Sequence, residues 1–293
     1  MKDPLIFGRQ GAPVHFLHAN GYPPEAYRTF LSPLTTEYQV VASYLRPLWD
    51  EVEYRSFLDW TLFRNDLLDF FRQLGGRGVL SRARWVGDHQ VIGLGHSIGA
   101  TVSLMAALSR RDLFRALVLI EPVLFPPWKS YLIEKSAWLG LLSRFHPLIR
   151  RTRRRKTHFS SREAMFRNYR KKEVFQDIPD QVLRDYVEGL ARDTASGGVS
   201  LAYDPRWEAQ IYATGGIYDR QLWKLLPELD LPMLVIRGEH SDTLSRKGLE
   251  RLVDRAQRME GAEVPEAGHL APLERPQAVS HLVREYLSRL KEE

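Results

Sequence analysis

Short apolar segments alternate with longer helical ones along most of this 293-residue chain, and this alternation restricts its fold more than any other feature. Apolar residues at helical spacing lie between several of these segments, as in residues 57–74 and 98–109. Such alternation predicts a parallel sheet that is covered by helices on both faces. Six segments have strand character: residues 14–17, 38–45, 90–94, 116–120, 233–237 and 262–264.

A long stretch of different composition interrupts the alternation after residue 122. Residues 123–225 hold 19 of the 42 lysines and arginines but 11 of the 36 acidic residues, so the rest of the chain carries 23 basic against 25 acidic side chains. This stretch also has helical spacing and scattered aromatic residues. We therefore expect residues 1–122 and 229–293 to form two parts of one core, and residues 123–228 to form an inserted helical lid.

The composition excludes several kinds of chemistry. The chain has no cysteine, which removes disulfides, thiolate nucleophiles and cysteine-based metal sites. No stretch approaches the ~20 apolar residues of a membrane span, and the apolar run near the N-terminus is too short for a signal-peptide core. We expect a protein of the cytoplasm that does not insert stably into membranes.

One motif joins a strand to a helix and carries a nucleophile. Gly95-His96-Ser97-Ile98-Gly99 follows the apolar residues 90–94 and opens an Ala- and Leu-rich helical segment. A serine on such a sharp turn is lifted above the sheet edge, and side chains at the flanking glycine positions would collide. The helix N-terminus directs backbone N–H groups at the place where an oxyanion forms. We predict Ser97 as nucleophile and the Ile98 N–H as an oxyanion donor.

A serine hydroxyl needs a base to take its proton. In folds that present the serine on a strand-to-helix turn, the acid and then the histidine follow it along the chain. His269 lies in a predicted loop just after the strand at residues 262–264. His281 falls within the last amphipathic helix, where a packing role suits it better. His96, beside Ser97, is interpreted as a packing residue of the turn. We therefore predict His269 as the base.

A carboxylate must hold the tautomer of that histidine. The loop after the strand at residues 233–237 contains Asp242, 27 residues before His269, which leaves room for one helix and one short strand. Asp242 is our predicted acid. Glu121, at the end of the strand at residues 116–120, is a second candidate because it would face the same rim; its alternative role is a polar anchor at the start of the insert.

With these residues in hand, the chain resembles the α/β-hydrolase superfamily over nearly its whole length, in the branch with a serine nucleophile and a helical lid. The resemblance implies a mostly parallel sheet of about six or seven strands and catalysis by Ser97, Asp242 and His269. Four motifs carry it: His18-Ala19-Asn20-Gly21, Gly95-His96-Ser97-Ile98-Gly99, Arg237-Gly238-Glu239-His240-Ser241-Asp242 and Gly268-His269-Leu270-Ala271-Pro272-Leu273-Glu274.

The sequence departs from the superfamily pattern at two places near its start. Relatives usually have His-Gly-x in the first motif, and the x residue gives the second oxyanion donor; here Ala19 replaces the glycine and the donor falls on the Asn20 N–H. Relatives also place a β-hairpin before this strand. Only about a dozen residues are available here, so we expect the hairpin to be missing or reduced.

The lid supplies the expected walls of the substrate pocket. Phe125, Trp128 and Trp207 are our candidates, although packing in the lid core is the more ordinary role for each taken alone. The basic run at residues 150–156 has three interpretations: a solvated face of the lid, a weak contact with acidic substrates or an anionic membrane surface, or nucleic-acid binding. No nucleic-acid-binding motif accompanies the run, so we expect no nucleic-acid partner.

The predicted reaction is acyl transfer to water. Ser97 attacks a carboxylic ester or related acyl bond of a small molecule, and His269 then activates water to release the acid. The mechanism needs no cofactor, and the sequence has no H-E-x-x-H or comparable ligand spacing, so we expect no metal. A C–C bond hydrolase, a thioesterase or a lactonase would use the same residues, and a ligand-binding protein could retain them with little turnover.

Overall fold

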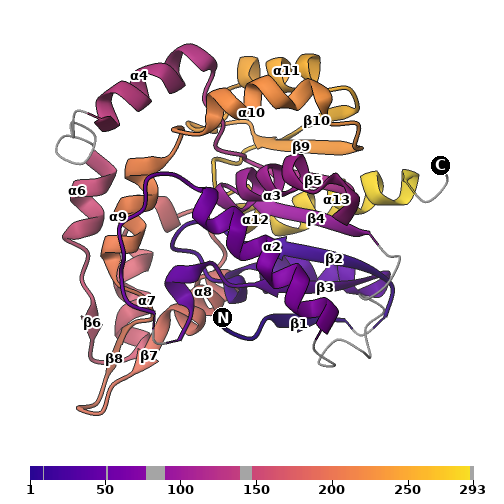
Figure 1. The fold of residues 1–293 in the computed structure, drawn as a ribbon. Helices are drawn as coiled ribbons and strands as arrows, with labels where there is room; N and C mark the ends of the chain where they lie inside the picture. The colour runs from indigo at the N-terminus through magenta and orange to yellow at the C-terminus, as the bar shows by residue number, and fades with distance from the viewer. Residues whose placement is uncertain (9, 51, 77–89, 139–146, 291–293) are drawn as a thin grey trace.

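A seven-stranded sheet forms the centre of the molecule (Figure 1). The computed structural model describes residues 1–290 apart from residues 9, 51, 77–89 and 139–146. The spatial order of the strands is β1-β3-β2-β4-β5-β9-β10, and all neighbours are parallel except β1, which runs antiparallel to β3. The strands are β1 (Leu5–Phe7), β2 (Ala12–Leu17), β3 (Tyr38–Ser43), β4 (Val91–His96), β5 (Phe114–Ile120), β9 (Met233–Gly238) and β10 (Met259–Val264).

The sheet confirms the predicted fold class. All six segments with strand character form strands, and the expected reduction of the N-terminal hairpin leaves a single short antiparallel strand, β1. The connections agree with the parallel arrangement, because each parallel pair that follows in sequence is joined by a helical crossover. The fold is therefore an α/β-hydrolase fold with seven strands in the described part of the chain.

Helices cover both faces of the sheet and create two separate cores. On β5, Val118 and Ile120 point into one core, whereas Leu117 and Leu119 point into the other, as strand alternation requires. The first core contains α1 (Arg28–Leu31), α12 (Ala271–Glu274) and α13 (Pro276–Arg289). The second contains α2 (Thr61–Gly76), α3 (Ile98–Ser109), α10 (Asp219–Leu225) and α11 (Arg246–Arg255).

The stretch between β5 and β9, which we call the insert (residues 123–228), contains more than helices. A three-stranded antiparallel sheet, in the order β6-β8-β7, accompanies the helices. Two or three residues per strand are too few to produce a readable period, so the sequence predicted helices alone. The strands of this sheet are β6 (His158–Phe159), β7 (Ala191–Asp193) and β8 (Val199–Leu201). The described α-helices of the insert are α4 (Pro127–Trp138), α6 (Pro147–Arg153), α7 (Arg162–Arg170), α8 (Asp180–Leu190), α9 (Pro205–Thr214) and α10.

The part of the insert from α4 to α9 lies along one end of the sheet, at the left of Figure 1. It meets the chain where β2 ends: α8 packs against the single 3₁₀ turn Pro24–Tyr27, and the Asn20 side chain donates a hydrogen bond to the Glu208 carbonyl of α9 at 3.2 Å. This is the edge at which the parallel strands β2, β4 and β5 have their carboxyl ends. Within the described residues, no helix combines the length and the apolar character that crossing a membrane requires.

Candidate active site

Ser97 occupies a strained turn between β4 and α3. Its φ of 57° and ψ of −122° lie outside the regions that L-residues ordinarily adopt. The surrounding backbone holds the turn, because the Ser97 N–H donates to the Ile120 carbonyl at 2.9 Å while its own carbonyl accepts from the N–H groups of Ala100 and Thr101. Such strain is retained where neighbouring structure enforces it, and here it presents a hydroxyl at the sheet edge.

Both flanking glycines are required by the space available. A Cβ atom at Gly95 would lie 2.5 Å from the Ala100 nitrogen and from the Gly99 carbonyl oxygen. A Cβ at Gly99 would lie 2.0 Å from the Leu17 carbonyl oxygen. The second contact brings the first turn of α3 directly against the end of β2, so the helix N-terminus and the loop that begins at His18 are neighbours.

The structure brings His269 to Ser97, as the sequence predicted. The His269 Nε2 atom lies 3.0 Å from the Ser97 Oγ atom, across 172 positions of sequence. The His269 side chain follows β10, in the loop before α12, and is 23% exposed. The hydroxyl is therefore within reach of a base that solvent can approach.

Glu121 takes the place that we predicted for Asp242. Its Oε2 atom lies 3.0 Å from the His269 Nδ1 atom. Glu121 is fully buried, and its Oε1 atom also accepts from the Gly238 N–H at 2.6 Å, while Oε2 accepts from the Ser241 hydroxyl at 2.5 Å. The carboxylate is thus held by three donors, one of which is the histidine.

The predicted pairing of Asp242 with His269 is wrong. Asp242 is exposed, and one of its carboxylate oxygens accepts from the Thr243 hydroxyl at 3.0 Å. The reason lies in the preceding residue: the Ser241 Oγ atom donates to Glu121 and accepts from the N–H groups of Thr243 and Leu244, which turns the chain so that Asp242 faces outward.

Strand order and register, which only the structure shows, explain why Glu121 rather than Asp242 reaches His269. β5 is the direct neighbour of β4, and His96 pairs with Ile120, so the next residues, Ser97 and Glu121, leave the sheet side by side. β9, which precedes Asp242, lies one strand farther away. Glu121 also has a positive φ of 50°, which turns the chain as it leaves β5.

A buried chain of hydrogen bonds joins the base loop to the loop after β2. The His96 Nε2 atom lies 2.8 Å from the His269 carbonyl oxygen and its Nδ1 atom 2.7 Å from the Tyr27 hydroxyl. Burial holds the pKa of His96 well below its usual value, so the ring is neutral; Nε2 donates to the carbonyl, and Nδ1 accepts from the tyrosine. The Ala19 N–H in turn donates to that tyrosine oxygen at 3.2 Å. His96 is therefore more than the packing residue that we predicted.

The two predicted oxyanion donors lie on adjacent elements. Ile98 is the first residue of α3, and N–H groups in a first helical turn have no partner within the helix. Asn20 follows His18, whose Nε2 atom accepts from the Leu45 N–H at 2.9 Å; burial lowers the pKa of this histidine to about 4, so it is neutral. The Ala19 N–H already donates to Tyr27. The next N–H along the loop is that of Asn20, the predicted donor.

The three predicted pocket walls lie in three different environments. Phe125 is half-buried where α4 meets α10, with its N–H donating to Asp219 at 2.6 Å. Trp128 is 64% exposed and faces solvent. Trp207 is buried on α9, where its ring stacks on Phe57 at 5.8 Å between centroids and lines a cavity. The structure thus does not bring these three residues together as one wall.

The basic run divides into two parts. The four residues Arg150, Arg151, Arg153 and Arg154 are exposed, as is Lys156. Arg155 instead points inward and pairs with Glu208 at 2.6 Å, so the interpretation of the run as one solvated face is wrong at this position. The contact of the exposed part with an anionic surface stays a prediction. The described residues contain no group of three histidine, aspartate or glutamate side chains that could hold a metal ion.

Comparison with known proteins agrees with this architecture. The profile of a family described as "Alpha/beta hydrolase family" matches residues 16–282. No protein in a curated collection matched the chain. Among solved structures, an E-2-(acetamidomethylene)succinate hydrolase is 18% identical and aligns with a TM-score of 0.72, covering 97% of this chain and 93% of that one.

Two further structures have similar overlap. A thioesterase domain from the curacin biosynthetic pathway is 17% identical, with a TM-score of 0.69 and coverage of 95% of this chain and 93% of that one. An esterase of M. tuberculosis is 22% identical, with a TM-score of 0.69 and coverage of 98% and 93%. Identities this low show a shared fold, and the similar proteins differ in the bonds that their names say they cleave.

Proposed function

Because the chain belongs to the alpha/beta hydrolase family, we propose that it is a serine hydrolase that cleaves a carboxylic ester or related acyl bond through Ser97, His269 and Glu121. The observation that carries the proposal is the line of two hydrogen bonds, each 3.0 Å long, from the Ser97 hydroxyl through the His269 ring to the Glu121 carboxylate. This is the arrangement that activates a serine for attack on a carbonyl.

In the proposed acylation, the Ser97 oxygen attacks the carbonyl carbon and passes its proton to the His269 Nε2 atom. Negative charge develops on the carbonyl oxygen, and the N–H groups of Ile98 and Asn20 stabilise it. His269 then gives the proton to the leaving alcohol, and the acyl group remains on Ser97 as an ester.

Deacylation repeats the steps with water. His269 takes a proton from a water molecule, the resulting hydroxide attacks the acyl carbon, and the proton returns to the Ser97 oxygen as the acid leaves. In both stages Glu121 stabilises the positively charged imidazolium and fixes the tautomer that presents Nε2 to the serine. Its two further donors, Gly238 and Ser241, hold its orientation while the charge on the ring changes.

We assign the insert the role of a lid over this site. The contact between the Asn20 side chain and α9 supports that assignment, because it ties the insert to the residue that supplies an oxyanion donor. The name of one similar structure, a thioesterase domain, makes thioester hydrolysis an alternative, and lactone or C–C bond hydrolysis would use the same three residues. The alternative that is not an enzyme is a ligand-binding protein that keeps these residues but turns over little substrate.

Labelling with a fluorophosphonate tests the activated serine directly. We expect stoichiometric labelling of the wild-type protein, complete loss of labelling in Ser97→Ala, and unchanged labelling in Ser288→Ala, a control whose hydroxyl only donates to a carbonyl on the exposed face of α13. A wild-type protein that resists the reagent would contradict the proposal, and so would labelling that persists without Ser97.

A panel of substrates that resemble one another in their acyl part then separates ester hydrolysis from thioester, lactone and C–C bond hydrolysis. An oxygen ester, a thioester, a lactone and a vinylogous 1,5-diketone can be compared by kcat/KM in the same protein. We expect the highest kcat/KM for the oxygen ester. A higher value for another member would reassign the bond that is cleaved, whereas labelling of Ser97 without turnover of any member would favour the binding protein.

A further inference from the structure

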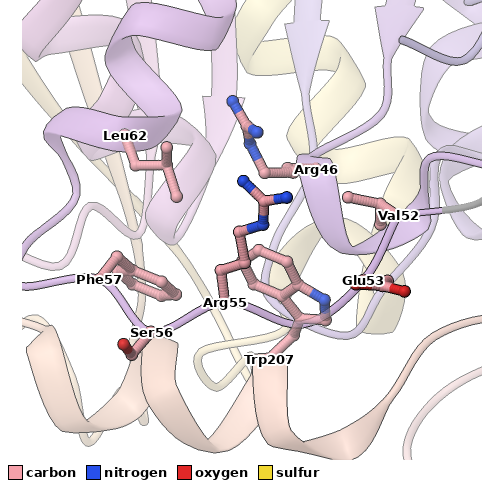
Figure 2. A pocket seen from close by; sticks show the side chains of 8 residues that line it. All are labelled: Arg46, Val52, Glu53, Arg55, Ser56, Phe57, Leu62 and Trp207. Atoms are coloured by element: carbon pink, nitrogen blue, oxygen red, sulfur yellow. The ribbon is translucent and has the colours of Figure 1, made fainter.

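A cavity lies between α9 and the chain segment that follows β3. Its volume is about 550 Å³, which falls in the range of small-molecule sites. Figure 2 shows the side chains that surround it: those from the segment and α2 on one side and Trp207 of α9 on the other. The lining residues are Arg46, Val52, Glu53, Arg55, Ser56, Phe57, Leu62 and Trp207. None of them belongs to the proposed catalytic set.

Two guanidinium groups give the cavity a cationic side. Arg46 binds Asp66 through its Nε and Nη2 atoms and lies over the Trp49 ring, so it is fixed in place with its remaining amino group unused by that carboxylate. Arg55 is exposed and lines the same space. Both guanidinium groups line the cavity, and in Figure 2 the Glu53 carboxylate points away from them. An anionic group would therefore meet Arg55 without having to displace an acidic neighbour.

The opposite side is aromatic. Phe57 stacks on Trp207 with an interplanar angle of 24°, and the Tyr54 ring meets the same indole edge-on at 5.5 Å. Trp207 is 1% exposed, and its indole N–H has no acceptor among the described residues. That nitrogen is covered by its neighbours, so the ring that a ligand can touch on this side is the half-buried Phe57. Flat aromatic walls favour a flat apolar ligand.

Hydrogen bonds between the segment and α9 hold the cavity walls in place. The Gln210 side chain donates to the Phe57 carbonyl at 2.8 Å and accepts from the Tyr54 hydroxyl at 3.4 Å. The Trp60 indole donates to the Ile211 carbonyl at 3.2 Å. The site is thus built before any ligand arrives, which reduces the ordering that binding would otherwise require.

We propose that this cavity binds a small molecule that has a carboxylate on a flat aromatic body. The carboxylate pairs with Arg55, whose planar fork of donors matches the two oxygens, with Arg46 adding positive charge beside it. The aromatic body lies against Phe57, which in turn stacks on the buried Trp207. The proposal concerns binding alone and does not depend on turnover at Ser97.

The indole signal of Trp207 provides a direct test with 2-naphthoate as the probe. Seven tryptophans give seven indole N–H signals in a ¹⁵N-labelled protein, and Trp207→Phe assigns one of them by its loss. The titration is carried out in the Ser97→Ala background, so a reaction at Ser97 cannot contribute. We expect the Trp207 signal to shift saturably with 2-naphthoate and to shift far less with neutral 2-naphthamide.

A second test asks whether the charge of Arg55 contributes to the binding of the carboxylate. Arg55→Gln should weaken the affinity for 2-naphthoate, measured by calorimetry, about tenfold or more, since a charge-assisted contact is lost. Arg72→Gln, on the exposed far part of α2, should leave it unchanged. The calorimetric arm needs no change to a buried residue, so it stands even if Trp207→Phe does not fold. Absence of binding, equal binding of the amide, or an affinity indifferent to Arg55 would each overturn the proposal.

Discussion

Glu121 shows how a single buried carboxylate can be fixed by its donors. It accepts from a backbone N–H, a serine hydroxyl and the His269 ring, and it has no exposed surface. A buried carboxylate without such partners would be costly, so these donors both stabilise the charge and set its direction. The residue that we propose orients the base is therefore placed by two segments, one after β5 and one at the end of β9 and just after it.

The first prediction separates the two candidate acids. Glu121→Gln keeps the shape of the side chain but removes the charge that stabilises the imidazolium, so kcat should fall about 10³- to 10⁴-fold with a small change in KM. Asp242→Asn should retain kcat within about twofold, because Asp242 is exposed and bonded to Thr243. Steady-state kinetics on one ester measures both. The reverse order of effects would return the role of the acid to Asp242.

The second prediction concerns Asp219, a buried carboxyl at the start of α10. Burial raises its pKa from the ordinary 3.8 to about 8, although the hydrogen bond from the Phe125 N–H opposes the shift. Between these two values the folded state holds a proton that the unfolded state has released. The contribution of this group to stability is therefore fully present below about pH 3.8 and is lost as the pH rises through about 8.

Asp219→Asn removes this titration and keeps an acceptor for the Phe125 N–H. The variant should gain in unfolding free energy relative to the wild type as the pH rises from 4 to 8, by an amount on the order of a few kcal/mol, and the gain should level off above 8. Thermal or urea unfolding across that range measures it. A difference that stays flat with pH would show that the folded-state pKa of Asp219 is ordinary.

At the scale of elements, the periodic parts of the chain were predictable and the short ones were not. The apolar run of β4 and the Ala-rich α3 gave clear patterns, and the predicted helix at residues 98–109 has the bounds of α3. The strands β6, β7 and β8 are too short for any period, and they exist because they pair with one another. The sequence also does not show the order of the strands in the sheet. For that reason it could not show that Glu121 lies close to Ser97.

The third prediction tests the close approach of α3 to β2. Gly99→Ala would place a methyl group 2.0 Å from the Leu17 carbonyl, so the helix must shift away from the strand. We expect a loss of about 3 kcal/mol or more in unfolding free energy, together with lower kcat, because the two oxyanion donors would separate. Urea unfolding and ester hydrolysis measure the two effects.

Gly248 is a matched control for that substitution. It also lies in the first turn of a helix, α11, and an added Cβ would meet side-chain atoms of Leu244 and Ser245 at 3.1 and 3.3 Å rather than backbone. Gly248→Ala should leave stability within about 1 kcal/mol and activity unchanged. If both variants behaved alike, the approach of α3 to β2 would not be the reason for glycine at position 99.

At the scale of the whole molecule, a buried polar cluster joins the insert to the core. Arg155 pairs with Glu208 at 2.6 Å and also donates to the hydroxyls of Tyr186 and Tyr203. The cluster lies against Gly21, where an added Cβ would come within 2.8 Å of the Tyr203 oxygen. Gly21 follows Asn20, so the cluster joins α9 to the loop of residues 18–21, which we call the oxyanion loop because it holds the proposed donor Asn20.

The last prediction is that this cluster couples the stability of the insert to catalysis. Arg155→Met leaves the Glu208 carboxylate buried without its cation, and the single variant should lose about 3–5 kcal/mol of unfolding free energy. Glu208→Gln alone should cost less, because the tyrosine hydroxyls still accept from Arg155. In the double variant no unpaired charge remains, so part of the loss should be recovered.

The coupling energy from this double-mutant cycle is expected to be at least about 1 kcal/mol. Activity supplies the second readout, because the Asn20 side chain is bonded to the Glu208 backbone. Displacement of α9 in Arg155→Met should lower kcat at temperatures where the protein remains folded, and the double variant should regain part of it. Additive losses in stability would show that Arg155 and Glu208 act independently, and unchanged kcat would show that α9 does not position the oxyanion loop.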